Sequence, residues 1–290
     1  MKTKAELAAL PDGVHDLSRE EYDALPERVN FSTLKWMERS PAHYLHQLTV
    51  RDDKDTDARQ RGRAVSMAVY EPERFRAECV VYEGGPRKGK DWNVFLDNHP
   101  DAEILTPAMH AAAVAIAQAA RSCGMARPFL SGGRGEQTLL WTHVVPDMGS
   151  VPGYSVRCKG RLDFIANVGA IVDLKNSKDA SPLGFGRQVV NYFSDVQAAF
   201  YVDGFKAATG RELPYVIVAV EPVAPYVTQV YQVPAAVLQR GREKYMGWLD
   251  RLNVCRRDSD WPGYASAPME LELPRWAMPN NEDELQEEAA

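Results

Sequence analysis

The pattern of apolar and polar positions marks the middle of this chain as rich in strands. Residues 136–146, 153–166 and 169–176 are dense in Val, Ile, Leu, Tyr and Thr, with Gly and Pro between them. Two similar stretches follow at 214–221 and 226–233. Short runs of this composition, separated by turn residues, are typical of β-strands. We therefore predict a sheet built from these five segments.

Helical periodicity surrounds these strands. We predict helices over 61–70, 107–122 and 187–208, and a last one that Pro234 opens and that ends near Val254. Proline is favoured at the first position of a helix, as Pro107 is here. Ser32 is predicted to cap a helix from Thr33 to about Gln47, interrupted near Pro41, although a role for Ser32 at a DNA end stays open.

The order of these elements predicts an α/β fold: a central mixed β-sheet flanked by helices, with an N-terminal helical part. No internal repeat divides the chain, so we expect one domain over 1–265 with its core at about 130–254. Residues 266–290 are expected to form an extended, acidic tail.

Composition excludes several classes of protein. No apolar run approaches the roughly 20 residues that span a bilayer, and the N-terminal residues lack the pattern of a secretion signal, so we expect a cytoplasmic protein. The four cysteines are dispersed without a Cys-x-x-Cys pair, which favours reduced thiols over disulfides or zinc.

The net charge of −6 looks unsuited to nucleic-acid binding, but its distribution is uneven. The last eleven residues carry five acids, so the remainder sums to about −1. Bases cluster within that remainder, at Arg59, Arg61 and Arg63, at Arg87, Lys88 and Lys90, and at Arg157, Lys159 and Arg161. Such clusters bind phosphates locally, although clustered charge is also common on solvated faces.

Alternation along the segment 153–166 separates two kinds of side chain, because neighbouring residues of a strand point to opposite faces. One face is predicted to hold Tyr154, Val156, Cys158, Gly160, Leu162 and Phe164, and the other Arg157, Lys159, Arg161 and Asp163. On the following strand, Asp173 and Lys175 share a face.

An Asp and a Lys on a largely buried strand need compensation for their charges. A metal ion held by Asp163 and Asp173 would supply it, and carboxylate oxygens suit Mg²⁺ or, as a substitute, Mn²⁺. Lys175 would then stand beside the metal and orient an attacking water. A purely structural Asp–Lys ion pair is the alternative, and spacing alone leaves both open.

The stretch GRLDF at 160–164 followed by IVDLKNS at 171–177 resembles the PD-(D/E)xK nuclease superfamily. More narrowly, the chain resembles the phage and prophage exodeoxyribonuclease VIII (RecE-type) exonucleases. Supporting stretches, which span about 30–233 with the central strands, are FSTLKWMERSPAHYLHQL (31–48), RGRAVSMAVYEPERF (61–75), GKDW (89–92) and DASPLGFGRQVVNYFSDVQAAFYVDGF (179–205).

This resemblance implies a restriction-endonuclease-like core and a set of roles. Asp163 and Asp173 match metal-binding carboxylates, and Lys175 matches the catalytic lysine. The backbone carbonyl of Leu174 is implied as a further ligand, and Glu136 as a ligand or water-orienting group. Gln197 and Tyr201 match the helix that lines the site. DNA contacts are expected from Ser32, Arg61, Arg63, Arg157, Lys159 and Arg161.

One departure from the pattern stands at Ser66, where many relatives carry a His. That puts a second metal site in doubt. Exonucleases of the phage lambda type resemble this arrangement in working without that His, so loss of activity does not follow.

The resemblance implies a Mg²⁺-dependent exonuclease that cuts double-stranded DNA from its ends, 5′ to 3′, in a bacterial or phage-infected cell. It also implies a ring-shaped homo-oligomer, a tetramer or a trimer, and a single-strand annealing partner of the RecT or Beta type. Two alternatives are a weakened relative that only binds DNA and a nicking or structure-specific endonuclease. CRISPR-associated members of the latter class often hold an iron–sulfur cluster on four cysteines, which the dispersed cysteines here disfavour.

Overall fold

A six-stranded mixed sheet forms the centre of the computed structural model, which describes residues 1–50, 56–149, 152–274 and 277. The strand order is β1-β4-β5-β6-β7-β8, with β6 and β7 parallel and the other neighbours antiparallel. Their bounds are β1 Gly13–His15, β4 Gly133–Val145, β5 Tyr154–Ala166, β6 Ala170–Asn176, β7 Tyr215–Val220 and β8 Thr228–Gln232. The predicted α/β fold with a mixed sheet is confirmed.

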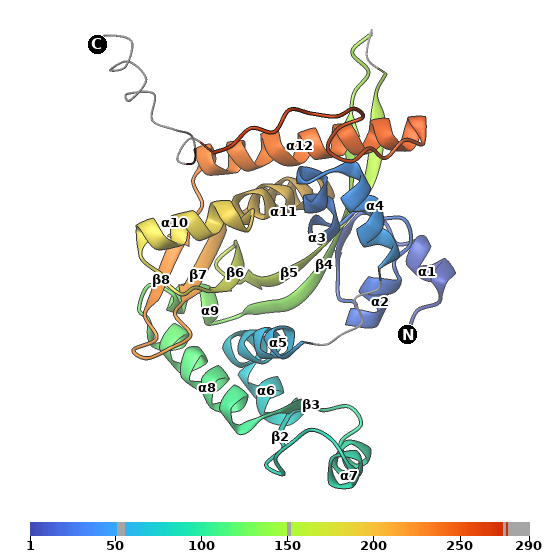
Figure 1. Ribbon diagram of the computed structural model, residues 1–290. Coiled ribbons are helices and arrows are strands. Elements are labelled where there is room, and N and C mark those ends of the chain that lie inside the picture. Colours follow the sequence, from blue (N-terminus) through green and yellow to red (C-terminus); the bar gives the residue numbers. More distant parts are fainter. Residues whose placement is uncertain (51–55, 150–151, 275–276, 278–290) are drawn as a thin grey trace, which may run out of the picture.

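Helices cover both faces of this sheet (Figure 1). One face carries α10 (Pro182–Asn191), α11 (Ser194–Thr209) and α12 (Ala235–Asp258). The other carries α5 (Asp57–Tyr70), α6 (Pro72–Glu78), α8 (Pro107–Ser122) and α9 (Arg127–Leu130). Each face therefore buries its own apolar core, which is the arrangement that parallel strands such as β6 and β7 require.

The remaining elements lie at the edges. Near the N-terminus are α1 (Lys4–Ala8), α2 (Arg19–Ala24), α3 (Phe31–Leu34), a 3-10 turn η1 (Lys35–Glu38) and α4 (Pro41–Thr49). The short parallel pair β2 (Cys79–Val81) and β3 (Glu103–Leu105) carries α7 (Lys90–Asn98) away from the main sheet (Figure 1).

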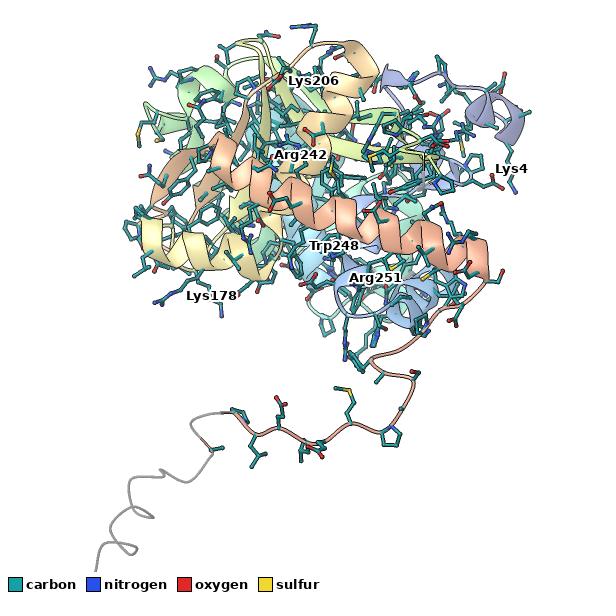
Figure 2. All side chains as sticks on the ribbon, turned by 90° about the horizontal axis from the view of Figure 1, so that it is seen from above. Lys4, Lys178, Lys206, Arg242, Trp248 and Arg251 are labelled. Atoms are coloured by element: carbon teal, nitrogen blue, oxygen red, sulfur yellow. The ribbon has the colours of Figure 1, made fainter. Side chains whose placement is uncertain are left out.

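The first and last parts of the chain are joined on the α12 side. Glu38 at the end of η1 accepts hydrogen bonds from Lys244 and from the Trp248 indole, the latter at 2.9 Å. Arg251 donates to the carbonyl of Met37 at 3.1 Å. Figure 2, seen from above, shows α12 lying across this face with Trp248 and Arg251 along it. The position of η1 is thus set by α12.

Two helix predictions need correction. The expected helix over 187–208 is two helices, because Phe193 adopts a left-handed conformation (φ 58°) between α10 and α11. Ser32 is not a cap: Asn30 accepts the Thr33 amide at 2.9 Å, and Ser32 lies inside α3 with its hydroxyl on Asn30 Oδ1. An Asn accepts the first free amides of a helix as well as Ser does.

The predicted alternation along β5 is wrong beyond Leu162. Leu162 packs in the core beneath α11, whereas Phe164 packs in the core beneath α5 and α8. In the β4–β5 register the break falls where Glu136 stands opposite Asp163, between the pairs Gln137–Leu162 and Gly135–Phe164. Glu136 has a left-handed backbone (φ 48°) that strands do not normally adopt. Asp163 therefore does not share the face of β5 that holds Arg157, Lys159 and Arg161, as the alternation had predicted.

Within the ranges given above, no helix combines the length and apolar character needed to cross a membrane. The single-domain boundary at residue 265 stays a prediction, and the acidic part of the expected tail, residues 280–290, lies outside the described residues.

Candidate active site

The antiparallel register of β5 and β6 brings two carboxylates face to face. Phe164 pairs with Val172, so the next residues along the two strands, Asp163 and Asp173, fall opposite each other. Asp173 is buried, with 3% of its surface exposed, and Asp163 is half-buried. Directly opposed like charges destabilise a strand pair unless a cation or a proton compensates them.

Lys175 is the cation nearest to this pair. Its Nζ lies 2.8 Å from Oδ2 of Asp173 and donates a 3.0 Å hydrogen bond to Oε1 of Gln197. A quarter of the Lys175 side chain is exposed. The ammonium group is therefore held between β6 and α11, and it keeps access to solvent.

α11 supplies the opposite wall of the site. Gln197 and Tyr201 are four residues apart and so lie on one face of this helix. Tyr201 packs against Gly160 of β5 so closely that a Cβ on Gly160 would stand 2.7 Å from its Cε1. The absence of a side chain at Gly160 lets α11 approach β5 at this point.

Burial and mutual charge control the titration of these groups. Burial raises the pKa of Asp163 well above its ordinary range, and the charge of Asp173 raises it further, while Lys175 and the Leu174 amide lower it. Burial alone would lower the pKa of Lys175, but the Asp173 and Asp163 charges outweigh it and leave the pKa above its ordinary value. The lysine is thus a stable cation beside two crowded carboxylates.

Three tyrosines close the site from different elements. Tyr70 of α5 stacks on Phe164 and directs its hydroxyl towards the Val172 carbonyl at 3.5 Å. Burial raises the pKa of Tyr201 to about 12, and it raises that of Tyr70 and Tyr215 well above the ordinary value. The charges of Asp163 and Asp173 add to each of these shifts. All three hydroxyls therefore remain neutral donors near the carboxylates.

The donor set fits a divalent cation. Oδ2 of Asp173 is buried and forms no hydrogen bond of regular geometry with the described residues, although the Lys175 ammonium group lies 2.8 Å away. A carboxylate oxygen has two lone pairs, so this one can bind a divalent cation as well as Lys175. No group of three or more His, Cys, Asp or Glu side chains that could hold a metal occurs among the described residues. Metal binding would rest on Asp163 and Asp173 with non-carboxylate ligands, and the predicted role of the Leu174 carbonyl stays a prediction.

Glu136 is not brought to these carboxylates. Its carboxylate accepts a 3.0 Å hydrogen bond from Arg161 and lies 3.6 Å from Arg74. The left-handed backbone at Glu136 turns its side chain away from Asp163, although the two residues are opposite in register. The structure therefore gives no support to Glu136 as a ligand.

The bases of β5 point into the protein instead of an open surface. Lys159 is buried, donates to the Tyr22 carbonyl at 2.8 Å and lies 4.6 Å from the centre of the Tyr22 ring. Arg157 donates to the carbonyl of Ala8, and Arg161 to that of Leu17. The N-terminal segment covers this face, and its backbone carbonyls accept hydrogen bonds from all three cations. The structure therefore does not support their expected contacts with DNA.

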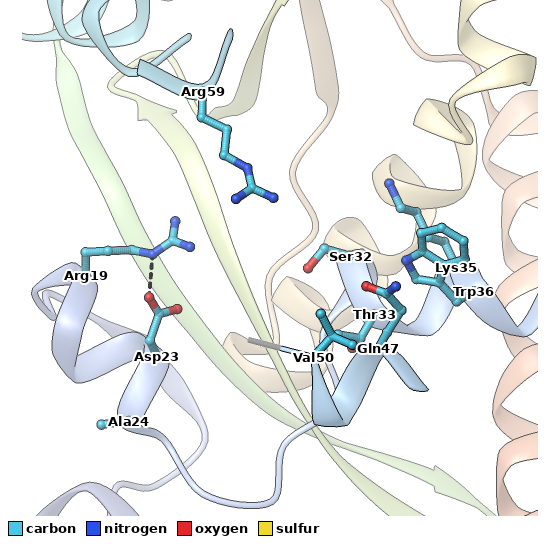
Figure 3. A pocket seen from close by; sticks show the side chains of 10 residues that line it. All are labelled: Arg19, Asp23, Ala24, Ser32, Thr33, Lys35, Trp36, Gln47, Val50 and Arg59. Atoms are coloured by element: carbon cyan, nitrogen blue, oxygen red, sulfur yellow. Dashed lines mark hydrogen bonds and ion pairs between the residues drawn. The ribbon is translucent and has the colours of Figure 1, made fainter. Parts of the chain in front are cut away.

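The other predicted DNA contacts differ in position. Arg63 forms a two-pronged ion pair with Glu103, at 2.9 and 3.0 Å. Arg61 is exposed on α5. Ser32 lines a cleft of about 920 Å³ between α2, α3, η1 and α5 (Figure 3). Of these three residues, only Ser32 belongs to that cleft.

Residues that sequence reasoning missed help to complete this cleft. Its lining includes Arg19, Lys35 and Trp36, which the sequence did not single out, and Arg59 of the basic cluster named above (Figure 3). Burial lowers the pKa of Lys35, and the charge of Lys175 lowers it further. The lining of the cleft does not include Asp163, Asp173 or Lys175. Lys35 follows Ser32 by three residues in the FSTLK stretch, and that helical spacing was the available signal.

Residues 30–270 match the family described as "PDDEXK-like domain of unknown function (DUF3799)". This chain belongs to that family. The match includes Asp163, Asp173, Lys175, Gln197 and the three tyrosines around them, whereas Arg19 of the cleft lies before it. The chain is accordingly a member of the PD-(D/E)xK nuclease superfamily. The catalytic roles of Asp163, Asp173 and Lys175 stay a prediction.

Solved structures similar to this PDDEXK-like chain support the fold. A protein from Eubacterium rectale, described as a "Putative exonuclease", is 19% identical with a TM-score of 0.57, and the match covers 90% of this chain and 96% of that one. The structure of SSO0001 is 14% identical over 74% of this chain and 83% of its own, but its TM-score of 0.27 is too low to argue from. No curated protein matches the sequence.

Proposed function

We propose that this protein is a divalent-metal-dependent exonuclease that degrades double-stranded DNA from its ends. The observation that carries the proposal is the placement of Lys175 between Asp173 and Gln197, with Asp163 opposite Asp173. Two facing carboxylates, one buried and one half-buried, beside a fixed and partly exposed ammonium group suit metal-assisted phosphodiester hydrolysis.

Each side chain has a definable task. The Gln197 amide oxygen fixes the Lys175 ammonium group, which is then directed at developing negative charge on a phosphate or its attacking water. Asp163 and Asp173 would hold Mg²⁺, or Mn²⁺ in its place, and the ion would supply electrophilic activation of the phosphate and an acidified water. Tyr70, Tyr201 and Tyr215 keep bulk water from the buried side of the carboxylates.

The description of the Eubacterium rectale structure as a putative exonuclease supports the exonuclease proposal. The finer features rest on the resemblance to exodeoxyribonuclease VIII alone. They are 5′-to-3′ polarity, a ring of four or three subunits around DNA, and delivery of the 3′ tail to a single-strand annealing protein. A bacterial or phage-infected cytoplasm would contain these partners. A ring also suits a protein of net charge −6, since encirclement does not depend on salt-sensitive phosphate affinity.

A time course on linear duplex labelled at either end, beside a covalently closed circle, tests the proposal. With Mg²⁺ or Mn²⁺ we expect loss of the 5′ label as mononucleotides, a persistent 3′ strand and an intact circle. Chelation should stop the reaction. Equal cutting of circle and linear DNA would overturn the exonuclease assignment in favour of an endonuclease, and binding without cleavage under any metal would favour the weakened relative.

A further inference from the structure

The segment after Tyr264 carries apolar side chains that the described part of its own chain leaves in water. Every second residue from 269 to 273 is apolar, Glu270 and Glu272 alternate with these residues, and a proline stands on either side. In an extended segment this alternation puts the apolar side chains on one face and the two acids on the other. The apolar set, with exposed fractions of 75%, 87% and 52%, is Met269, Leu271 and Leu273. Exposed apolar groups gathered on one face mark an interaction site.

α4 and η1 fix the place where this segment begins. The Trp261 ring stacks on Tyr44 of α4, with 6.0 Å between the ring centroids. Arg39, directly after η1, donates a 2.8 Å hydrogen bond to the Tyr264 hydroxyl. Beyond Tyr264, no hydrogen bond ties the segment 265–274 to another described part of the chain. Figure 2 shows the segment extending away from the body of the protein, so it is held at its base and presented to solvent.

An apolar groove of about 500 Å³ lies on the outer face of α10. Its lining includes Leu183, Gly186, Arg187 and Val190, which share one helix face because they follow the first of them by three, four and seven positions. The opposite face of α10 buries Phe185 in the core, whereas Leu183 and Val190 are exposed. A Cβ on Gly186 would meet no described atom within 4 Å. The helix backbone is therefore open to close approach at Gly186.

The groove and the segment match in length and in charge. The two apolar side chains of the groove are seven positions apart, which is about 10 Å along a helix axis. The outer two apolar side chains of the segment are four positions apart, which is about 13 Å in an extended chain. Lys178 and Arg187 outweigh Asp179 at this end of α10, whereas the segment carries two acids and no base. This complementarity favours contact between the two surfaces over contact of either with its own kind.

We propose that the segment 265–274 of one copy of this chain docks in the α10 groove of a second copy. Within one copy both surfaces are exposed at once, and docking between copies removes both from water. The inference deepens the ring of the proposed function and rests on that assembly, not on the cleavage chemistry.

The contact joins two different surfaces, so each copy gives its segment to one neighbour and receives a segment from another. A contact of this kind closes into a ring when the rotation between copies allows it. Five residues in a groove bury less surface than a standard interface between proteins. We therefore expect the assembly to dissociate on dilution.

Sedimentation velocity over a wide range of protein concentration tests the contact. Leu183→Ser alters the groove, and the double variant Leu271→Ser with Leu273→Ser alters the segment. Val94→Ser, at an exposed apolar residue of α7, is the matched control. The wild type and the control should sediment with a mass of several chains, and each of the other two variants with the mass of one chain. Thermal unfolding checks that every variant is folded.

A mixture of the groove variant and the segment variant separates docking between copies from docking within one copy. The groove variant still has an intact segment, and the segment variant still has an intact groove. Mixed in equal amounts, the two should form a dimer and nothing larger, because only one contact per pair is complete. A mixture that keeps the mass of one chain would overturn the proposal, since it would place the segment on its own chain.

Two further results would also overturn the contact: a wild type with the mass of one chain at every concentration, and an assembly that neither variant changes. Cleavage of linear duplex, measured on the same samples, keeps the two proposals apart. An assembly that depends on Leu183 and Leu271 but cuts no DNA with any metal would refute the nuclease and keep the contact. A wild type that cuts linear duplex as a single chain would refute the contact and the ring and keep the nuclease.

Discussion

Gly160 of β5 lies against the ring of Tyr201 on α11, with room for a hydrogen and no more: a Cβ would stand 2.7 Å from Cε1. Gly160→Ala should therefore displace Tyr201 and lower the free energy of unfolding by about 1–3 kcal/mol, the usual cost of overpacking a core. Cleavage should fall as well, because Tyr201 shares its helix face with Gln197. Denaturant titration and initial rates measure the two effects.

Gly62→Ala is the matched control for this substitution. Gly62 is inside α5, and a Cβ there meets nothing within 4 Å. The added methyl group should raise the free energy of unfolding by about 0.5–1 kcal/mol, since alanine favours a helix interior more than glycine does. If both variants were equally stable, the close contact with Tyr201 would not be the constraint on Gly160.

Lys175→Met and Asp173→Asn should each reduce cleavage at least about 100-fold, because each removes a charge that acts on the reacting phosphate or its metal. The melting temperature should stay near that of the wild type or rise for Asp173→Asn, which removes one of two opposed carboxylates. Rates are compared on the same linear duplex. Lys175→Met with wild-type rates would remove Lys175 from the mechanism.

Gln197→Leu should slow cleavage about 10- to 100-fold, the range found when a group that orients an active-site residue is lost. The Lys175 ammonium group would lose the oxygen that now lies 3.0 Å away. Gln197→Glu retains an acceptor and should be less impaired. We expect both variants to bind DNA as the wild type does, so a loss confined to binding would contradict the role given to Gln197.

Lys159 should make stability depend on pH in the alkaline range. Burial lowers the pKa of Lys159 to about 8, whereas an unfolded lysine titrates near 10.4. Between these values the folded protein binds fewer protons than the unfolded chain, so the free energy of unfolding rises with pH, by roughly 3 kcal/mol in total. Below pH 8 the cost of burying the charged lysine is present in full, and it disappears as pH rises to the unfolded value.

Denaturant titrations between pH 7 and 10.5 give the free energy of unfolding of the wild type and of Lys159→Met. The variant should be the more stable of the two at pH 7, and the difference should shrink as pH rises. Lys4→Met, at an exposed position, serves as the control. If Lys159→Met instead abolished DNA binding with no change in the pH dependence, the buried placement of Lys159 would be wrong.

Local pattern was sufficient to predict the central strands and the residues of the motif. The helix over 107–122 has the predicted bounds, since Thr106 and Pro107 form a cap and first turn that need no tertiary contact. The spacing of Asp173 and Lys175 predicted a shared strand face, and the two side chains do contact each other at 2.8 Å. Their catalytic role, and that of Asp163, rests on the family resemblance and stays a prediction.

Features that depend on distant segments could not be predicted in the same way. The sequence predicted DNA contacts for the bases of β5, but residues 1–29 cover these side chains and accept their hydrogen bonds. The sequence of β5 alone cannot predict this contact with a distant segment. The turn of Glu136 away from Asp163 follows from one left-handed residue in a strand, an exception to ordinary backbone preference. The cleft could not be predicted from the sequence, because α2, α3, η1 and α5 are separated along the chain and come together only in the folded protein.

The bonds from Glu38 and Met37 to α12 have a consequence for biosynthesis. Lys35 is translated long before Lys244, Trp248 and Arg251. During synthesis η1 therefore lacks its hydrogen bonds to α12 until all strands of the sheet have been made. The cleft wall is completed only when α12 has left the ribosome and docked. On the proposed function, we therefore expect a nascent chain that already contains Asp163, Asp173 and Lys175 to gain cutting activity only after α12 has been made and has docked on η1.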